Sequence, residues 1–213
     1  MKILIFAAHP DDEVLGMGGT IKKMSKKNNI ELCVVSEGVT AQYTDKKMIQ
    51  VRKESCKKSA KILGIKKITF LDFPDMRLDK IPHLEINQSL EKIVEKTNPE
   101  IIFTTPNNDL NKDHQAVFES TLVVSRPFSS NVKEILSYEL PGIKKTPFQS
   151  NRYVEINKEI TYKIKAFKMY KSEIENFPHP RSIKAIENLS IQRGIESNLK
   201  NAEAFQIIRS IIH

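Results

Sequence analysis

Short apolar runs alternate with longer amphipathic stretches over the first two-thirds of the chain. The apolar runs have the length of strands and are rich in Ile, Val and Phe, whereas the stretches between them repeat their apolar positions with helical spacing. The predicted strands are 3–8, 31–36, 67–73 and 100–105. The predicted helices are 13–27, 45–63, 83–96 and 113–124. This alternation predicts βαβ units with right-handed crossovers and a mostly parallel sheet.

The pattern changes after residue 125. A Pro/Gly loop separates two further strands, predicted at 134–140 and 152–156, and the chain is predicted to end with helices at 158–171, 182–192 and 201–212. No linker, repeat or low-complexity segment divides it. We therefore expect an α/β protein with a Rossmann-like three-layer fold and a single domain, residues 1–213. Its core would be about 1–125, and the strands and helices of the C-terminal extension, 126–213, would form part of the active-site rim.

Composition narrows the class of protein. Hydrophobic residues make up 39% and charged residues 28% of the 213 residues, which is typical of a folded globular chain. No apolar run approaches the roughly 20 residues of a membrane helix, so no integral membrane segment is expected. The apolar run after Lys2 meets His9 too soon for a signal peptide. Cys33 and Cys56 match no zinc or redox spacing. We therefore expect a cytoplasmic protein.

The net charge of +8 comes from lysines that are scattered in doublets along the chain. Nucleic-acid-binding surfaces usually concentrate basic residues and place aromatic residues between them. This chain has no Trp and no stretch of that kind. We interpret the lysines as a solvated surface and expect no nucleic acid as partner. Part of the charge would attract an anionic small substrate.

The stretch HPDDEVLGMGG, residues 9–19, begins where the first predicted strand ends. Its glycines come too late for a dinucleotide fingerprint, and carboxylates at the turn would repel a pyrophosphate. The glycines instead favour close packing of the helix, or its tilt, against the neighbouring backbone. Two interpretations of the acids remain. They cap the helix and complement its dipole, or His9 and Asp12 hold a metal ion beyond the sheet edge, where open α/β sheets bind ligands.

A second polar cluster, TTPNNDLNKDHQAV, follows the fourth predicted strand at residues 104–117. A single His at the start of a helix is most often a surface or capping residue. His114, however, would lie at the same edge of the sheet as His9 and Asp12, and it would supply a third ligand. Two His and one carboxylate, with a position open for water, form a common catalytic zinc site.

Together these motifs resemble the LmbE/PIG-L deacetylases, which remove acetyl groups from N-acetylglucosamine-type sugars. The resemblance rests on AHPDDE at 8–13 paired with DLNKDH at 109–114. It extends to VRKESCKKSAKILGI at 51–65, FLDFPDMRL at 70–78 and HPRSIKAIENLSIQRGIESNLKNAEAF at 179–205. It therefore covers nearly the whole chain.

The resemblance implies a zinc enzyme in which His9, Asp12 and His114 bind Zn²⁺ and Asp11 is the general base. Zinc would acidify a bound water and polarise the acetyl carbonyl. Asp11, near the metal but not a ligand, would take the water's proton and return it to the departing amine. Sites of this kind also accept Fe²⁺ or Co²⁺.

One position departs from many members of the family, which carry a His three residues before the second metal-binding His. Here that residue is Asn111, whose amide can donate a hydrogen bond but cannot carry a proton. Either Asn111 stabilises the oxyanion as a neutral donor, or His179 takes this catalytic role and Arg181 meets anionic groups of the substrate. His179 is explained equally well as an exposed loop residue beside two prolines.

Three more residues are candidates for substrate binding. The resemblance places Arg52 at the pocket, against sugar hydroxyls or active-site carboxylates, although its helix position also fits a surface charge. Asp75 and Arg77 follow the third predicted strand and would line the same crevice. Glu203 is expected to be a solvated acid of an amphipathic terminal helix.

The expected function is removal of the N-acetyl group from an N-acetylglucosamine-type amino sugar or its conjugate, so the partner is a small molecule. Two alternatives remain: a deacetylase of a glucosamine conjugate in low-molecular-weight thiol biosynthesis, and a non-catalytic sugar- or metal-binding protein on this fold. Retention of Asp11 argues against the second, because a binding site needs no free base. The sequence does not reveal the aglycone, and a homo-oligomer is compatible with it.

Overall fold

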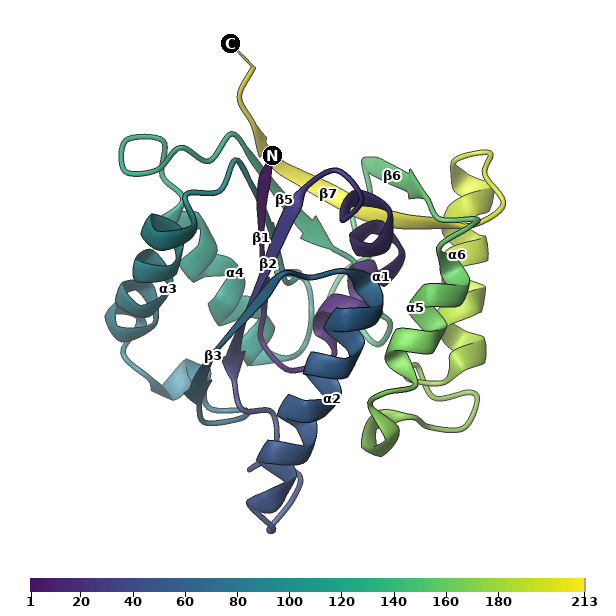
Figure 1. Ribbon diagram of the computed structural model, residues 1–213, viewed down its shortest axis with the longest axis horizontal. Helices are drawn as coiled ribbons and strands as arrows, with labels where there is room; N and C mark the ends of the chain where they lie inside the picture. Colours follow the sequence, from purple (N-terminus) through teal and green to yellow (C-terminus); the bar gives the residue numbers. More distant parts are fainter. Residues whose placement is uncertain (213) are drawn as a thin grey trace.

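The computed structural model describes residues 1–212 and contains a sheet of seven strands in the order β3-β2-β1-β4-β5-β7-β6 (Figure 1). The strands are β1 (Lys2–Ala7), β2 (Asn29–Ser36), β3 (Lys67–Phe73), β4 (Ile101–Thr104), β5 (Glu134–Tyr138), β6 (Arg152–Glu155) and β7 (Ala202–Ser210). The first five pair in parallel, and β7 is antiparallel to both β5 and β6. The predicted parallel core is therefore confirmed, with β7 and β6 added at one edge.

Helices cover both faces of the sheet. Within residues 1–212 the α-helices are α1 (Asp12–Met24), α2 (Lys47–Leu63), α3 (His83–Thr97), α4 (Lys112–Val124), α5 (Ile160–Phe167) and α6 (Ile183–Glu196). Two short 3₁₀ helices are η1 (Leu78–Lys80) and η2 (Lys171–Glu173). Helices α3 and α4 cover one face, and α1, α2, α5 and α6 lie on the other (Figure 1). This is the three-layer α/β fold expected from the sequence.

Strand β1 lies in the middle of the core. Ile3 and Ile5 join the side-chain cluster under α1, α2 and α5, whereas Leu4 and Phe6 join the cluster under α3 and α4. All four are buried. A strand that is covered on both faces has no polar side, which explains the continuous apolar run in the sequence. The strand delivers the residues that follow it to a protected edge of the sheet.

The helix predicted at 201–212 is wrong, because Ala202–Ser210 forms β7. Phe205 and Ile207 join one core cluster and Ile208 joins the other, as alternate residues of a strand do. Short apolar runs fit a helix or a strand almost equally well in a sequence. Here hydrogen bonding to β5 on one side and β6 on the other decides in favour of the strand.

Helix α1 packs very close to the sheet because glycines lie on that side. A Cβ at Gly16 would be 2.3 Å from Tyr138 Cδ2, and one at Gly19 would be 2.7 Å from Ile156 Cγ2. The predicted close packing of this helix is confirmed, and its neighbours are side chains rather than backbone. The contact fixes the position of a helix whose first residue is Asp12.

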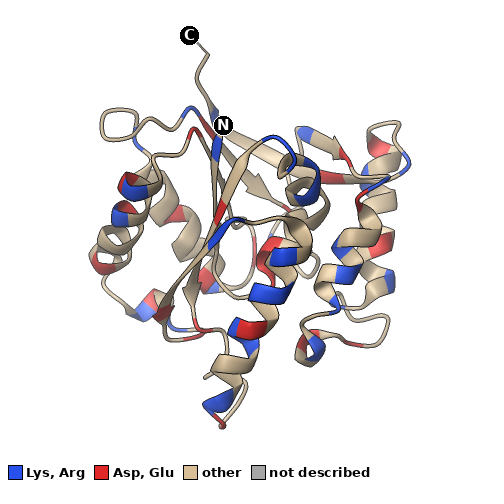
Figure 2. Ribbon diagram, in the orientation of Figure 1, with Lys and Arg blue, Asp and Glu red and all other residues tan. Residues whose placement is uncertain are grey.

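Charged residues of both signs are interspersed on the helices, as Figure 2 shows for α2, α3 and α6. This agrees with the scattered lysine doublets of the sequence. Cys33 and Cys56 are both free and buried. Within residues 1–212, no helix combines the length and the apolar character needed to cross a bilayer.

Candidate active site

The two polar motifs meet at one edge of the sheet. Strands β1 and β4 are parallel neighbours, so the segments that follow them leave the sheet on the same side. After β1 come His9 and a tight turn, in which Asp11 has a φ of 124°. Such a backbone is strained for a residue with a side chain, and strain of this kind clusters at functional sites. His114 lies in the first turn of α4.

His9, Asp12 and His114 form a compact group. Asp12 lies between the two imidazoles, with Oδ2 3.5 Å from His9 Nδ1 and Oδ1 3.4 Å from His114 Nε2. One ligand atom from each of the three residues lies within 4.8 Å of the others. All three residues are buried, and the rings pack edge to face with centroids 5.2 Å apart. The sequence placed these three residues at one site, and the structure brings them together.

A second group of the same compactness consists of His9, Asp75 and Asp113. The Asp113 carboxylate, however, already accepts hydrogen bonds from the backbone N–H groups of Met76 and Leu78, at 2.8 and 3.0 Å. It also lies 3.1 Å from His9 Nε2. Carboxylates in this position typically orient a metal-binding His through its other ring nitrogen. Asp113 therefore fits an orienting role, and His9 Nδ1 is left for a metal.

His114 has the same arrangement in reverse. Its Nδ1 lies 3.1 Å from Asp109 Oδ2, and both of its ring nitrogens are buried without a geometrically formed hydrogen bond to residues 1–212. A buried nitrogen without a partner is costly unless something else occupies that position. Two imidazole nitrogens and a carboxylate around one point suit a divalent transition-metal ion. The residues present therefore fit a metal site.

The surrounding carboxylates raise the pKa of both histidines. Burial alone lowers the pKa of His114, but Asp12 and Asp109 outweigh it and raise the pKa to about 9. Burial is likewise outweighed at His9, where Asp113 and Asp12 raise the pKa well above its usual range. A divalent cation would occupy the same negative field in place of those protons, because both imidazoles must be neutral to act as ligands.

Asp11 differs from Asp12 in its surroundings. Its Oδ2 is buried 3.3 Å from Arg52 Nη2 and has no hydrogen-bond partner in the part of the chain that the structure describes. Burial raises the pKa of Asp11 to about 6, against the lowering effect of Arg52 and Arg181. Asp11 is thus mostly a carboxylate at neutral pH, and its Oδ2, though paired with Arg52, accepts no hydrogen bond, so it can serve as a general base.

Arg52 and Arg181 both pair with the same acid, Glu173, and both lower the pKa of Asp11. Arg52 is buried on α2, donates to the carbonyl oxygen of Pro10, and places Nη1 2.9 Å from Glu173 Oε2. Arg181 Nη1 lies 2.6 Å from the same Glu173 oxygen. The structure thus brings Arg52 to the active-site carboxylates, one of the two positions expected for it. Arg181 joins the same network from the C-terminal extension.

Other predicted site residues lie at varying distances from this centre. Asp75 is buried, with Oδ1 3.3 Å from His9 Nε2. Asn111 caps α4, because its Oδ1 accepts from the backbone N–H of Asp113 at 2.8 Å. The capping bond uses only Oδ1, and the role of the amide NH₂ as an oxyanion donor stays a prediction. Arg77 is exposed, at the start of η1.

No contact of His179 or Glu203 with the candidate ligands is described within residues 1–212. His179 is exposed, and its Nδ1 accepts from the backbone N–H of Arg181 at 3.1 Å. The expectation of a solvated Glu203 is wrong, since it is buried on β7 and its Oε1 lies 2.6 Å from Lys163 Nζ. The mistaken helix assignment caused this error, because it placed Glu203 on an outer face.

Sequence reasoning missed three acids that support the site. Asp109 and Asp113 lie within the DLNKDH motif, so their closeness to His114 in the sequence could have indicated a supporting role. Glu173 carried no such signal, because it comes from a lysine-rich segment far from either motif. Only the packing of the extension against α2 brings it to Arg52.

Comparisons with known proteins find similar chains among deacetylases. The model of the PIG-L family, described as GlcNAc-PI de-N-acetylase, matches residues 4–125, which include the three candidate ligands. The chain is 31% identical over 179 residues to the uncharacterized deacetylase YaiS of Escherichia coli K12, covering 80% of this chain and 90% of that protein.

Two diacetylchitobiose deacetylases are also similar. The chain is 33% identical over 107 residues to the one from Thermococcus kodakarensis, covering 47% of this chain and only 39% of that protein. The solved structure of N,N'-diacetylchitobiose deacetylase from Pyrococcus horikoshii has a TM-score of 0.83 at 23% identity, covering 98% of this chain and 84% of that one. The second likeness is one of fold.

Proposed function

Because the chain belongs to the PIG-L family, we propose that it is a metal-dependent hydrolase that removes the N-acetyl group from an N-acetylglucosamine-type amino sugar or its conjugate. The observation that carries this proposal is the pairing of a three-ligand group with a separate carboxylate. His9, Asp12 and His114 converge on one point, and Asp11, next to Asp12 in the chain, has an Oδ2 that accepts no hydrogen bond and faces only Arg52 at 3.3 Å. A site that only bound a metal would not require Asp11, a carboxylate that is not one of the ligands.

The metal that we propose is Zn²⁺, held by His9 Nδ1, Asp12 and His114 Nε2. When bound, it would acidify a water molecule and polarise the acetyl carbonyl. Asp113 and Asp109 keep the two imidazoles in the orientation and tautomer that ligation needs. Fe²⁺ and Co²⁺ satisfy the same donors, so the test below is made with each ion.

Asp11 is the proposed general base and acid. Its free Oδ2 takes a proton from the attacking water, and the same proton then passes to the departing nitrogen, because an amide anion is a very poor leaving group. Arg52 holds the carboxylate in place through its contacts with Asp11, Pro10 and Glu173. This supports a positioning role for Arg52 beside its expected contact with the sugar.

The oxyanion and the sugar need further donors. We propose the amide NH₂ of Asn111 as a neutral donor to the oxyanion, since its Oδ1 is already engaged in capping α4. His179 remains the alternative for this catalytic role. Asp75, Arg77 and Arg181 are proposed to bind the substrate. Arg181 is the one proposed to meet anionic groups of the substrate, since it joins the Arg52 and Glu173 network beside Asp11.

Metal content and acetate release test this function together. Wild type, loaded separately with Zn²⁺, Fe²⁺ or Co²⁺, is expected to hold one ion per chain and to release acetate from a panel of N-acetylglucosamine, diacetylchitobiose and glucosaminyl conjugates. His114→Ala is expected to lose both properties. His83→Ala, which removes a His from the start of α3, is the matched control. A wild-type protein that binds no ion, or a His114→Ala variant that still releases acetate, would refute the proposal.

A further inference from the structure

Glu13 ends the run HPDDE, and the proposed chemistry gives it no role. Its side chain is fully buried, and neither of the two candidate ligand groups described within residues 1–212 includes it. Both of its oxygens accept a hydrogen bond. Oε2 accepts from the backbone N–H of Asp11 at 3.2 Å, and Oε1 accepts from the hydroxyl of Tyr170 at 2.7 Å. Glu13 therefore connects the turn that carries the proposed base to the C-terminal extension.

The turn at Asp11 depends on contacts of this kind. Its φ of 124° and ψ of −21° are strained for a residue with a side chain, and a strained backbone persists only where its surroundings impose it. Within residues 1–212, Glu13 is the one acceptor described for the Asp11 N–H. Without that acceptor the N–H would lose its partner and the turn could relax, which would move the Asp11 carboxylate.

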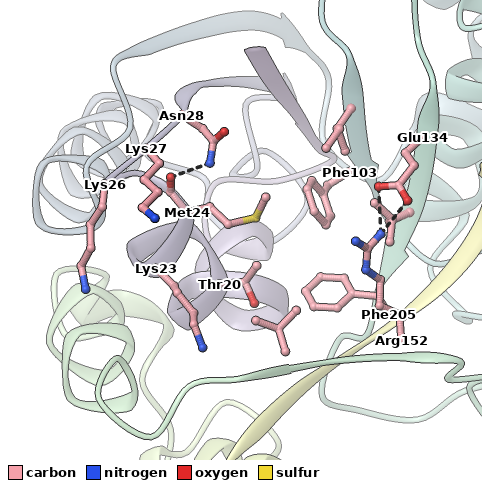
Figure 3. A pocket seen from close by; sticks show the side chains of 13 residues that line it. Thr20, Lys23, Met24, Lys26, Lys27, Asn28, Phe103, Glu134, Arg152 and Phe205 are labelled. Carbon is pink, nitrogen blue, oxygen red and sulfur yellow. Dashed lines mark hydrogen bonds and ion pairs between the residues drawn. The ribbon is translucent and has the colours of Figure 1, made fainter. Parts of the chain in front are cut away.

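The far end of α1 contributes little to holding this turn. The helix is kinked at Met17, so its two halves do not form one rigid rod. Its last residue, Met24, borders an open space of about 480 Å³ between α1 and the sheet (Figure 3). The position of Asp11 is therefore set by contacts at the start of the helix.

Tyr170 supplies the other end of the connection from outside both polar motifs. It lies between α5 and η2, and its ring is fully buried in the core cluster under α1, α2 and α5. That packing gives its hydroxyl a fixed place from which to hold Glu13. The match to the PIG-L family model ends at residue 125, so Tyr170 lies beyond the matched part of the chain.

Stability alone does not explain an acid at position 13. Burial of a carboxyl group is costly, and hydrogen bonds only offset that cost. An apolar side chain facing a Phe ring at position 170 would bury no polar group, and exchanges of this kind are often close to neutral for stability. An apolar side chain cannot, however, accept a hydrogen bond from the Asp11 N–H. The acid therefore suits a role in holding the turn.

We propose that Glu13 and Tyr170 are positioning residues for the general base. Tyr170 holds Glu13, and Glu13 holds Asp11 in the backbone conformation that the reaction requires. The inference rests on the proposed function, because the position of Asp11 matters to turnover only if Asp11 is the base. A displacement of about 1 Å in an active site can lower turnover about 100-fold, so kcat should respond while the metal ligands stay in place.

The kinetics of acetate release by two Glu13 variants test the proposal. Glu13→Leu removes the acceptor and fills the space, so kcat should fall about 10–100-fold while KM and metal content stay within about twofold of wild type. Glu13→Gln keeps an amide oxygen for the Asp11 N–H and turns its NH₂ to the Tyr170 oxygen, so it should restore kcat to within about threefold of wild type. A wild-type kcat in Glu13→Leu, or a kcat in Glu13→Gln as low as in Glu13→Leu, would overturn the proposal.

Tyr170→Phe breaks the connection at its other end. We expect kcat to fall about 3–10-fold, and the double variant Glu13→Leu/Tyr170→Phe to be no slower than Glu13→Leu, because both changes break one connection. The matched control is Tyr138→Phe, which also deletes a fully buried hydroxyl, one that donates to the carbonyl oxygen of Phe6 at 2.9 Å. It should lower the melting temperature similarly and leave kcat unchanged. Additive losses in the double variant, or an equal loss of kcat in the control, would overturn the proposal.

Amide hydrogen exchange, followed by NMR, separates a failure of this inference from a failure of the proposed function. The Asp11 N–H should exchange slowly in wild type and at least about tenfold faster in folded Glu13→Leu, whether or not the protein releases acetate. A wild-type protein that releases no acetate would refute the proposed function. Equal exchange of the Asp11 N–H in wild type and in Glu13→Leu would overturn the positioning role alone.

Discussion

Two buried ionic clusters lie against helix α1, and they differ in how completely they are paired. The first, at the start of the helix, is the metal-site cluster of His9, Asp11, Asp12 and His114. The second, near its middle, is the Glu203–Lys163 pair. In the first, Asp11 Oδ2 and both ring nitrogens of His114 have no hydrogen-bond partner within residues 1–212. In the second, both Glu203 oxygens are engaged.

A kink in helix α1 explains why a buried acid lies at the position of Glu203. Helix α1 is kinked at Met17, whose φ of −144° interrupts the helical backbone. The N–H groups of Gly19 and Thr20 follow the kink, and they donate to Glu203 at 2.9 and 2.6 Å. An acid at this point caps the second half of α1 as it would cap the start of a separate helix.

The comparison teaches how to separate function from stability when both involve buried charge. A cluster that serves the fold satisfies its own atoms, because each buried unpaired group reduces stability. A cluster that binds and reacts must leave atoms free for the metal, the water and the substrate. Variants of the first cluster should therefore change activity more than stability, and variants of the second should do the reverse.

The largest effect is expected from Asp11→Asn. The amide keeps the shape of the side chain but cannot take a proton, so kcat for acetate release should fall by about 10²–10⁴-fold. Metal content should stay at the wild-type level, because Asp12 and not Asp11 contacts both histidines. Asp45→Asn, at an exposed position, is the control. Near-normal turnover in Asp11→Asn would show that another group is the base.

The next largest effect is expected on stability, from Glu203→Gln. Lys163 would remain buried without its counter-charge, and two N–H groups of α1 would share one acceptor, so unfolding should become easier by about 3–5 kcal/mol. Denaturant unfolding measures this change, with the exposed Glu155→Gln as control. Below its melting temperature the variant should still bind one metal ion. Loss of metal from the folded variant would mean that the two clusters are coupled.

These two clusters were predicted from the sequence to very different degrees. The site of His9, Asp12 and His114 could be predicted, because each motif directly follows an apolar strand and parallel strands bring their carboxyl ends to one edge. The role of Glu203 could not be predicted, because it depends on a kink in α1 and on the pairing of β7 with β6. Neither feature leaves a local pattern, and the segment around Glu203 fits an amphipathic helix as well as a strand.

The same distinction holds within the active site. Asp109 and Asp113 are local to a motif and follow from it once the helix start is known. Glu173 and Arg181 come from the extension, and their meeting with Arg52 depends on how the extension packs against α2. Long-range packing of this kind is set by the shapes of whole elements. No local pattern of residues in the sequence reveals it.

A smaller effect is expected from Asp109→Asn. Its Oδ1 could still accept from the backbone N–H of Asn111, but an NH₂ group would face His114 Nδ1 in place of a carboxylate. A carboxylate at this position fixes the tautomer of the metal-binding His114, so its loss should lower metal affinity about 10–100-fold. Competition with a chelator measures this fall, and Asp79→Asn at an exposed position is the control. Unchanged affinity would mean that His114 is held by its packing alone.

The smallest effect is expected from substitutions of Asn111. They separate its structural role, capping α4, from its proposed catalytic role as an oxyanion donor. Asn111→Ala removes the cap of α4, which should cost about 1 kcal/mol, and it also removes the proposed oxyanion donor. Asn111→Ser restores a capping oxygen, but its shorter side chain cannot place a donor where the amide NH₂ lies. If Asn111 acts on the oxyanion, Ser recovers the melting temperature and leaves kcat low, with KM little changed. If Asn111 only caps the helix, Ser recovers both, and the carbonyl-polarising role passes to His179, where His179→Ala should then lower kcat in the wild-type background.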